Sequence, residues 1–552
     1  MKVGLFAGLI LVLSGAAGGA QEMRGPRIVG APVDWSAALD ALSVDEPSET
    51  AASARPLRAR ANRSMPPALA RLNAAMGQRF PALAQSPVPV LLPFDTDAYL
   101  RDRADGAASD EALDDGQQYL SGFHARTFFF AGPSGYDAAF ALLPAEVPEL
   151  DDIKFPEPIQ IHISGSVLLY ELDHHPTVNG VSVPALEPDF PGIRRMIHEH
   201  HLRFTFVRHG APYVVSVGCF DAPVSRYKLP ACRAAERVAV RFLRALRIAG
   251  GTPQPMRAPE PLPIERPDEA SRSFSYHGPG RLLAGTGFRG EGGRADRTVY
   301  SQIRFPLADE PSFVNSQMFG SRNKPIAPGV SANHAYPWRD NFCERRGFPV
   351  GQCPAGVGHQ GQDLRPALCQ QTPGNGRCPP HNVVAVRDGA ILRAPKQEAL
   401  YLVVNTAREH VRFRYLHMHP GRMDADDMLS GRRVNEAEVI GQVSNFHKRE
   451  GGTSYHLHFD LQVPTRNGWV SVNPYMTLVA AYERLIGARG EEIGAPLQVA
   501  NADPATTAGL GTTLRTDNKV EKRSRYGKRH KAAKHKTYAK HKKRKKHRLA
   551  RY

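Results

Sequence analysis

The sequence predicts a multidomain protein in which an α+β N-terminal domain is followed by a mainly-β domain and a disordered basic C-terminal tail. Three observations lead to this fold class. Short apolar runs typical of strands, together with one helical segment, occupy residues 86–250. A second strand-rich region, punctuated by glycine, follows at 296–495. The positive charge is concentrated at the C-terminal end, and a chain of 552 residues is long enough for two or three domains.

Residues 1–20 have the pattern of a signal peptide. Lys2 supplies the positive start, Val3–Leu13 an apolar segment, and Ala17–Ala20 the small residues that precede cleavage. The apolar segment is shorter than the ~20 residues that a membrane-spanning helix needs. We therefore expect an exported protein, periplasmic or extracellular and cell-wall associated, with no transmembrane segment after signal cleavage.

The first domain is expected at residues 86–250, after a lead-in at 21–85. The lead-in is rich in Ala, Pro, Arg and Ser without periodicity, so we expect it to be mostly disordered. Strands of the domain are predicted at 88–94, 126–131, 159–172, 202–207 and 213–220. A turn at His209-Gly210 joins the last two strands into a hairpin. The sequence does not indicate the function of this domain.

A helix is predicted to begin at Pro230 and to end at Gly250-Gly251. Helical spacing places one set of its side chains in solvent and another in the core. The exposed set is Arg233, Arg237, Arg241 and Arg244, and the buried set is Val238, Phe242 and Leu246. Six prolines between Pro253 and Pro267 then predict a stiff, extended linker within residues 251–295.

Residues 496–552 are expected to form a disordered tail. From Lys519 to Tyr552 there are 17 Lys and Arg against one acidic residue, so this segment carries 16 of the 17 net positive charges. Repulsion at such charge density opposes folding. We expect the tail to bind anionic envelope polymers rather than a specific nucleic acid, since an exported protein meets acidic glycopolymers, lipopolysaccharide and phospholipid headgroups. A merely solubilising tail is the alternative.

The six cysteines agree with export to an oxidising compartment. Their short separations suggest the disulfides Cys219–Cys232, Cys343–Cys353 and Cys369–Cys378, although six cysteines allow fifteen pairings. The sequence contains no CxxC pair, which argues against zinc binding by cysteine. Disulfides in the loops on either side of residues 359–363 are the simpler role.

Two short motifs in the second domain have the composition of an open zinc site. They are His359-Gln-Gly-Gln-Asp363 and His456-Leu-His458, with Tyr415-Leu-His417 between them. Residues 455–463 alternate in the manner of a strand, so both histidines of the second motif share one face. Gly361 and Pro366 favour a loop running into a strand at the first motif. Zinc accepts imidazole nitrogen and carboxylate oxygen, and a catalytic site keeps one position for water.

This set of motifs resembles the lysostaphin-type (LytM-like) zinc metallopeptidase family, which cuts peptide bonds in bacterial peptidoglycan. Met318–Arg322, Val384–Gly389 and Asn473-Pro474 also fit the family, so that the resemblance covers about residues 296–490. It implies a peptidase domain at 296–495 whose antiparallel sheets form a groove. One departure is Asp460, which stands where the family commonly has glutamate.

The resemblance also implies roles for individual residues. It implies that His359, Asp363 and His458 bind one Zn²⁺ per catalytic domain, and that His456 and His417 are the catalytic histidines. We place His417 on a strand at 411–418, on the face that also carries Val411, Phe413 and Tyr415. His419 shares this face and is the alternative to His417.

Two further histidine clusters lie in the first domain, at Asp173-His174-His175 and at His198-Glu-His-His201. The second cluster is not an HExxH zinc motif, because Leu202 occupies the position of the second ligand. We expect both clusters to be solvated loop histidines.

The predicted function is that of an exported zinc metalloendopeptidase which hydrolyses peptide bonds in peptidoglycan through a zinc-activated water, with histidine as acid and base. The alternative is a non-enzymatic, envelope-binding regulator of other wall hydrolases. Such family members typically lack some metal ligands, whereas this chain has the full set. A polyanion-binding module based on the tail is a third interpretation. The sequence does not indicate which bond is cut or the oligomeric state.

Overall fold

A seven-stranded antiparallel sheet organises the first half of the chain. Its strand order is β3-β4-β5-β10-β9-β8-β7. The bounds are β3 His124–Gly132, β4 Gly135–Leu142, β5 Ile159–Ser166, β7 Val181–Ser182, β8 Arg194–His198, β9 His201–Arg208 and β10 Ala211–Gly218.

In this computed structural model the described residues are 22–43, 66–104, 117–155, 157–174, 180–198, 201–220, 232–255, 259–315, 337–369 and 377–494.

The predicted hairpin is confirmed. Arg208 of β9 lies opposite Ala211 of β10. The two residues between them, His209 and Gly210, both have positive φ, 48° and 72°. A two-residue turn with both central φ values positive matches the twist of the strands it joins.

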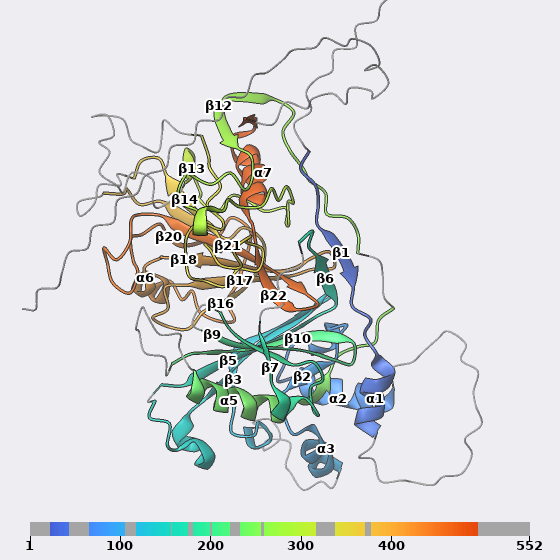
Figure 1. The fold of residues 1–552 in the computed structure, drawn as a ribbon. Helices are drawn as coiled ribbons and strands as arrows, with labels where there is room; N and C mark the ends of the chain where they lie inside the picture. Colours follow the sequence, from blue (N-terminus) through green and yellow to red (C-terminus); the bar gives the residue numbers. More distant parts are fainter. Residues whose placement is uncertain are drawn as a thin grey trace, which may run out of the picture. The chain divides into compact units, whose positions relative to one another are not determined.

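The helix of this region is shorter than predicted. Helix α5 spans Arg233–Arg244 and packs along the seven-stranded sheet, as Figure 1 shows. Its arginines are on the solvent side and Val238 and Phe242 are buried, as the spacing predicts. The end at Gly250 is wrong, because Arg247–Gly250 form strand β11, which pairs with β2 at Val90–Leu92. The predicted strand at 159–172 is likewise split, into β5 and β6, the latter Leu168–Glu171.

The expected disorder of residues 21–85 does not hold for the parts that the structure describes. They form strand β1 at Arg27–Gly30 and helices α1 at Trp35–Ser43 and α2 at Pro67–Gly77. β1 pairs with β6. Trp35, together with Leu69 and neighbours on α2, is buried in the core under the seven-stranded sheet. The buried residues of α2, Leu69, Leu72, Asn73 and Met76, lie at helical spacing. Helix α3, Thr96–Ala104, follows them.

The second half of the chain is built on an eight-stranded antiparallel sheet. Its strand order is β13-β14-β21-β18-β17-β16-β19, and β22 pairs with β21. The bounds are β13 Ser312–Val314, β14 Gln362–Pro366, β16 Gly389–Leu392, β17 Leu400–Asn405, β18 His410–Leu416, β19 Arg433–Val434, β21 Leu457–Thr465 and β22 Gly468–Val472. Helices α6, Pro420–Ala425, and α7, Tyr475–Ile486, accompany it, and β15, Asn382–Val384, pairs with β20, Val439–Gln442.

The segment predicted to be a linker also contains regular structure. Ala270–His277 form strand β12, which pairs in parallel with β23, Arg489–Ile493. Phe274 and Tyr276 of β12 are buried in the core of the eight-stranded sheet. Six short 3₁₀ turns complete the described secondary structure, at Leu83–Gln85, Gln117–Tyr119, Pro144–Glu146, Pro148–Leu150, Pro184–Leu186 and Phe288–Gly290.

Taken together, the described residues are mostly β-sheet with few helices, and they fall within one compact unit, Met1–Leu497. The disulfides Cys219–Cys232, Cys343–Cys353 and Cys369–Cys378 are all formed. None of the described helices has both the length and the apolar character needed to cross a membrane. The predicted signal peptide, the Met318–Arg322 motif and the basic tail lie outside the described residues.

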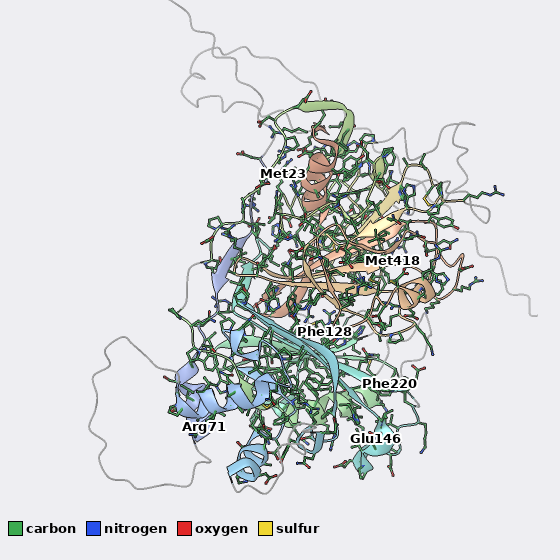
Figure 2. All side chains as sticks on the ribbon, turned by 180° about the vertical axis from the view of Figure 1, so that it is seen from behind. Met23, Arg71, Phe128, Glu146, Phe220 and Met418 are labelled. Atoms are coloured by element: carbon green, nitrogen blue, oxygen red, sulfur yellow. A yellow bond between two sulfur atoms is a disulfide. The ribbon has the colours of Figure 1, made fainter. Side chains whose placement is uncertain are left out.

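Buried polar contacts join the two sheets. Asp137 of β4 is 1% exposed, and its carboxylate is bonded to His410 Nε2 at 2.8 Å and to the Arg412 guanidinium, both on β18. Trp469 of β22 donates to the Ser164 hydroxyl of β5 at 2.8 Å. A small apolar cluster that includes Phe128, marked in Figure 2, and Val403 lies at the same junction. Burial acts to raise the pKa of Asp137, but attraction by the Arg412 guanidinium and the contact with His410 outweigh burial and lower the pKa.

We expect Asp137→Ala to lower the free energy of unfolding by about 3–5 kcal/mol, because it leaves the Arg412 charge buried without its counter-charge. Since the folded pKa of Asp137 is lowered, this contribution is present at neutral pH and is lost as acidification passes that pKa. Denaturant unfolding at neutral and acidic pH measures both effects.

Glu260→Ala is the control, because it breaks an ion pair with Arg408 whose side chains are both more than half exposed. Its expected cost is about 0–1 kcal/mol. Equal costs for the two variants would contradict the role given to Asp137.

Candidate metal centre

Strand pairing brings the two motifs together. β14 and β21 are antiparallel neighbours, and Asp363 lies directly opposite His458. Gly361 is required at this junction, because a Cβ on it would lie 2.4 Å from the Phe459 carbonyl oxygen and 2.9 Å from His458 Nε2. The glycine of the first motif therefore allows the incoming loop to approach β21 closely.

His359 is held by a disulfide-bonded loop. Its backbone N–H donates to the Glu344 carbonyl and its carbonyl accepts from the Cys343 N–H, each at 2.8 Å. Cys343 is bonded to Cys353. A Cβ at Gly358 would lie 2.7 Å from the Cys343 Cα, so the two segments are in close contact. The disulfide next to the first motif thus fixes the backbone that presents His359.

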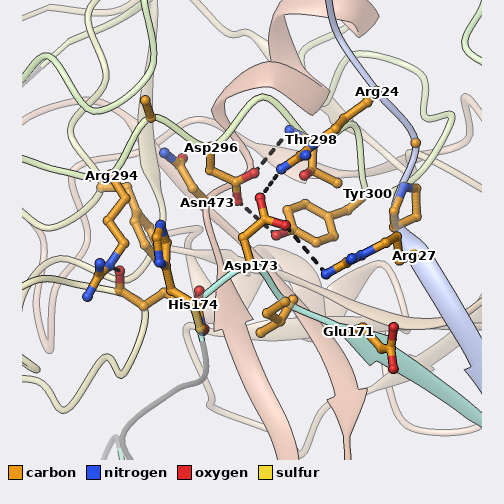
Figure 3. A pocket seen from close by; sticks show the side chains of 16 residues that line it. Arg24, Arg27, Glu171, Asp173, His174, Arg294, Asp296, Thr298, Tyr300 and Asn473 are labelled. Atoms are coloured by element: carbon orange, nitrogen blue, oxygen red, sulfur yellow. Dashed lines mark hydrogen bonds and ion pairs between the residues drawn. The ribbon is translucent and has the colours of Figure 1, made fainter.

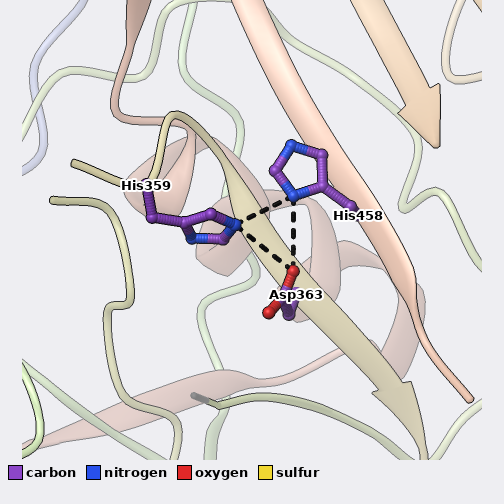
Figure 4. Close-up of side chains that lie close together, drawn as sticks. All are labelled: His359, Asp363 and His458. Atoms are coloured by element: carbon purple, nitrogen blue, oxygen red, sulfur yellow. Dashed lines mark hydrogen bonds and ion pairs between the residues drawn. The ribbon is translucent and has the colours of Figure 1, made fainter. Parts of the chain in front are cut away.

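Three potential ligand atoms converge at this point (Figure 4). His359 Nε2 is 2.9 Å from His458 Nδ1, and Asp363 Oδ1 is 3.5 Å from the former and 3.3 Å from the latter. All three residues are buried, and each offers one ligand atom within 4.8 Å of the others. The predicted ligand residues thus form one group that can hold a metal ion.

Hydrogen bonds on the far side of each ring fix which nitrogen carries a proton. His359 Nδ1 lies 2.9 Å from the Asn341 carbonyl, which can only accept, so Nδ1 is the donor and Nε2 keeps its lone pair. His458 Nε2 lies 3.3 Å from the Asp460 carboxylate, to which Nε2–H can donate, so Nδ1 is the lone-pair nitrogen of the neutral ring. A metal ion would displace the proton that Asp363, 3.3 Å away, otherwise draws to Nδ1. Two imidazole lone pairs and a carboxylate oxygen therefore point at one another, an arrangement that a cation stabilises.

The carboxylate fits a metal ligand by a second criterion. Asp363 is fully buried, and its Oδ2 has no hydrogen-bond partner among the described residues. Burial acts to raise the pKa of Asp363, but attraction by the His359 and His456 imidazoles holds this pKa well below its usual value. A buried anion with an unsatisfied oxygen is costly unless a cation or donor compensates it.

His456 and His417 lie beside this group. His456 Nε2 is 3.5 Å from Asp363 Oδ1, so both histidines of the second motif reach the same carboxylate oxygen. The rings of His417 and His456 are 4.8 Å apart between centroids. His456 Nδ1 donates to the Ser454 carbonyl at 2.7 Å, and His417 Nδ1 donates to the Phe446 carbonyl at 3.0 Å. In each ring Nε2 therefore keeps its lone pair.

The predicted face of His417 is wrong. Strand β18 ends at Leu416, and Tyr415 points into the core, where its hydroxyl accepts the Val386 N–H at 3.0 Å. His417 has φ 73°, in the left-handed region. This conformation breaks the strand alternation, so His417 lines the same cavity as its neighbour Leu416. A residue other than glycine there costs about 1–3 kcal/mol, which is typical of functional sites.

Both of these imidazoles are poor proton carriers before substrate binds. Burial lowers the pKa of His417 to about 2 and that of His456 to about 3. Burial also acts to lower the pKa of His458, but hydrogen bonds with Asp363 and Asp460 outweigh it and raise that pKa. The carboxylates that attract a proton to His458 also attract a metal cation.

The candidate ligands open into a cavity of about 760 Å³, here called the inter-sheet cavity, because residues of both sheets line it. His359, His458 and His417 lie on one side of it. The seven-stranded sheet contributes His162, His201, Arg203 and Ser216. The sequence does not indicate that these four residues lie at the site, because only a long-range contact between the sheets brings them there. His201 was expected to be a solvated loop histidine, but it lies on strand β9 and lines the cavity.

Sequence reasoning also missed the residues that support the ligands. Gln362 donates to Asp340 at 2.6 Å and to Asn473 at 3.0 Å, and its side-chain oxygen accepts the Asn341 N–H at 3.0 Å. This network holds the carbonyl that fixes the His359 tautomer. On the other side of the site, Arg414 donates to Asp460. Asn473 belongs to a motif singled out in the sequence, but its partners are distant in the chain.

A smaller cavity of about 140 Å³ lies apart from the metal group (Figure 3). Several of its charged groups have partners, since Asp173 contacts Arg24 and Arg27, and the Tyr300 hydroxyl donates to Asp296 at 2.8 Å. His174 lines this cavity, and His175 lies outside the described residues. Neither His174 nor His201 belongs to a potential metal group among the residues searched.

Comparisons with known proteins add little. No family model matches the chain, and no curated protein matches it. Among solved structures, the chain is similar to one from Ruminococcus gnavus described as a glycyl-glycine endopeptidase LytM, with 22% identity and a TM-score of 0.18. The match covers 24% of this chain and 49% of that one, so it spans about half of the other protein. Such a low TM-score carries no argument, and the candidate site rests on its own geometry.

We expect His458→Ala to lose bound zinc and His456→Ala to retain about one zinc per chain, because only the first change removes a converging lone pair. Metal analysis after dialysis against a low zinc concentration measures this difference. If His456→Ala lost zinc and His458→Ala retained it, His456 would be the metal ligand and His458 the neighbouring histidine.

Proposed function

We propose that the protein is an exported zinc metalloendopeptidase that hydrolyses peptide bonds in peptidoglycan. One observation carries the proposal: two imidazole lone pairs and the Asp363 carboxylate converge beside the buried His456, and His417 lies next to His456 at the wall of a large cavity. The resemblance of these motifs to lysostaphin-type peptidases supplies the substrate class. The three disulfides and the predicted signal peptide support export.

In this proposal His359, Asp363 and His458 hold Zn²⁺, which, when bound, lowers the pKa of a coordinated water and polarises the scissile carbonyl. His456 takes the proton from the attacking water at Nε2, since its Nδ1 already donates to the Ser454 carbonyl. His417, whose ring centroid lies 4.8 Å from that of His456, presents an Nε2 lone pair and orients the water by accepting a hydrogen bond from it. The lowered pKa values keep both Nε2 atoms unprotonated across the usual pH range. Proton transfer to His456 therefore requires that bound metal and substrate raise its pKa toward the operating pH.

The charge of the inter-sheet cavity favours an anionic peptide. Six basic residues line it against one lining carboxylate, and they are Arg203, Arg346, Lys396, Arg412, Arg414 and Lys448. Two of them, Arg412 and Arg414, are paired with the buried carboxylates of Asp137 and Asp460, so the excess is smaller than this count. A cavity lined by one sign of charge concentrates ligands of the opposite sign. The stem peptides of peptidoglycan carry free carboxylates, so their charge suits this lining. We further propose that each sheet with its core is a domain, and that the seven-stranded sheet forms one wall of the substrate site.

Digestion of purified peptidoglycan of known crosslink type, followed by mass analysis of the fragments, tests this function. The proposal predicts fragments with a new amino group and a new carboxylate at one peptide bond, released only with zinc present. A non-enzymatic regulator would bind the same material and release no fragments. Wall hydrolysis that is unchanged in metal-free protein would contradict the proposed chemistry.

We expect His456→Ala to lower turnover by roughly 10²–10⁴, the usual range for the loss of an acid–base group. Substrate binding should change little, because the His456 side chain is buried against Asp363 and does not line the cavity. Initial rates on a soluble crosslinked peptide separate the two effects. His419→Ala is the control, since His419 pairs with the exposed Glu450, and a loss of similar size in this variant would favour His419 as the catalytic residue.

We also propose that Lys519–Tyr552 tether the enzyme to anionic envelope polymers. Replacing this segment by an uncharged one of equal length should spare cleavage of a small peptide and weaken binding to whole sacculi. Binding of the natural chain should fall steeply with salt, because attraction to a polyanion is screened and depends on counterion release. Sedimentation with sacculi across a salt series measures this, and equal binding by both chains would leave the tail a solubilising role only.

A further inference from the structure

We propose that Glu398, His417 and His447 form a second, weaker zinc site, and that its occupation stops catalysis by capturing His417. Each of these residues offers one ligand atom, and the three atoms lie within 4.8 Å of one another. The group shares no residue with His359, Asp363 and His458. The part of the proposal that concerns catalysis rests on the proposed function, whereas the binding of a second zinc does not.

Three separate elements bring this group together. His417 follows β18, and its left-handed backbone turns it into the inter-sheet cavity. His447 lies on the loop after β20, with its ring 5.3 Å from that of His417 between centroids. Glu398 lies on the turn before β17, and its carboxylate is 3.2 Å from His447 Nδ1.

The donors are arranged before any ion binds. One Glu398 oxygen accepts the Lys448 N–H at 3.0 Å, which fixes the loop that carries His447 to the turn that carries Glu398. His417 Nδ1 donates to the Phe446 carbonyl on the same loop, so its Nε2 lone pair is available to an ion. Two imidazoles and one carboxylate make a set of the type that zinc prefers, with room for a water as the fourth ligand.

Exposure distinguishes the two zinc groups. The first is buried, with the Asp363 carboxylate fully enclosed. In the second, the His447 side chain is 47% exposed, and solvent screens its interaction with Glu398. The second group should therefore fill only after the first, when free zinc exceeds one equivalent. Its occupation would then stop catalysis at high zinc concentration, since His417 cannot orient the water through an Nε2 lone pair that is bound to an ion.

A neighbouring pair of residues provides a matched control. His419 Nε2 lies 3.2 Å from Glu450 Oε1, the same separation as in the His447–Glu398 pair. This pair belongs to no group of three potential ligands among the residues searched. Glu450→Gln therefore removes a comparable His–Glu contact without touching a proposed ligand. All variants keep the four histidines of the tail, so zinc bound there is common to each of them.

The experiment titrates metal-free full-length protein with Zn²⁺ by calorimetry and follows peptide hydrolysis in parallel. The natural chain and Glu450→Gln should show one more equivalent of bound zinc than Glu398→Gln and His447→Ala. Hydrolysis should fall at excess zinc in the first two proteins and persist in the other two. Melting curves of the zinc-loaded variants identify any that fail to fold. If either Glu398→Gln or His447→Ala fails to fold, the other variant still tests the second site.

Equal zinc stoichiometry in the natural chain and in both Glu398→Gln and His447→Ala would overturn the second site. Equal inhibition of all four proteins by excess zinc would overturn its effect on His417. If none of the proteins hydrolyses wall peptides at any zinc level, the proposed function fails, while the stoichiometry still decides whether the second site exists.

Discussion

The arrangement of the candidate site depends on one buried carboxylate. Asp363 is fully enclosed, one of its oxygens has no partner among the described residues, and the other faces three imidazoles. An isolated buried anion costs several kcal/mol, so the surroundings must supply positive charge. Because the two imidazole nitrogens nearest to it also present lone pairs, a metal cation satisfies all of these groups together.

The rest of the local structure serves this convergence. The Cys343–Cys353 loop fixes the backbone of His359, the Asn341 carbonyl selects its tautomer, and Asp460 with Arg414 does the same for His458. Polar contacts of Asp137 and Trp469 then join the seven-stranded sheet to this scaffold, so that residues of both sheets line the cavity.

The sequence carries the local part of this arrangement and little of the rest. Alternation predicts the strand of the second motif, Gly361 and Pro366 predict a loop running into a strand, and the His209-Gly210 turn predicts its hairpin. The pairing that places Asp363 opposite His458 is seen only in the structure. The left-handed backbone at His417 has no signal in an alternating strand. Strand β12 and the helices before residue 85 are fixed by partners distant in the chain. Every residue has a backbone carbonyl, so the sequence cannot show which carbonyl accepts a hydrogen bond from an imidazole and thereby selects its tautomer.

Anomalous diffraction at the zinc edge from crystals grown with zinc tests the central claim most directly. The account predicts a strong peak about 2.0–2.1 Å from His359 Nε2 and from His458 Nδ1, and about 2.0–2.2 Å from an Asp363 oxygen. No peak at this position in zinc-saturated crystals, with the three side chains bonded directly to one another, would contradict it.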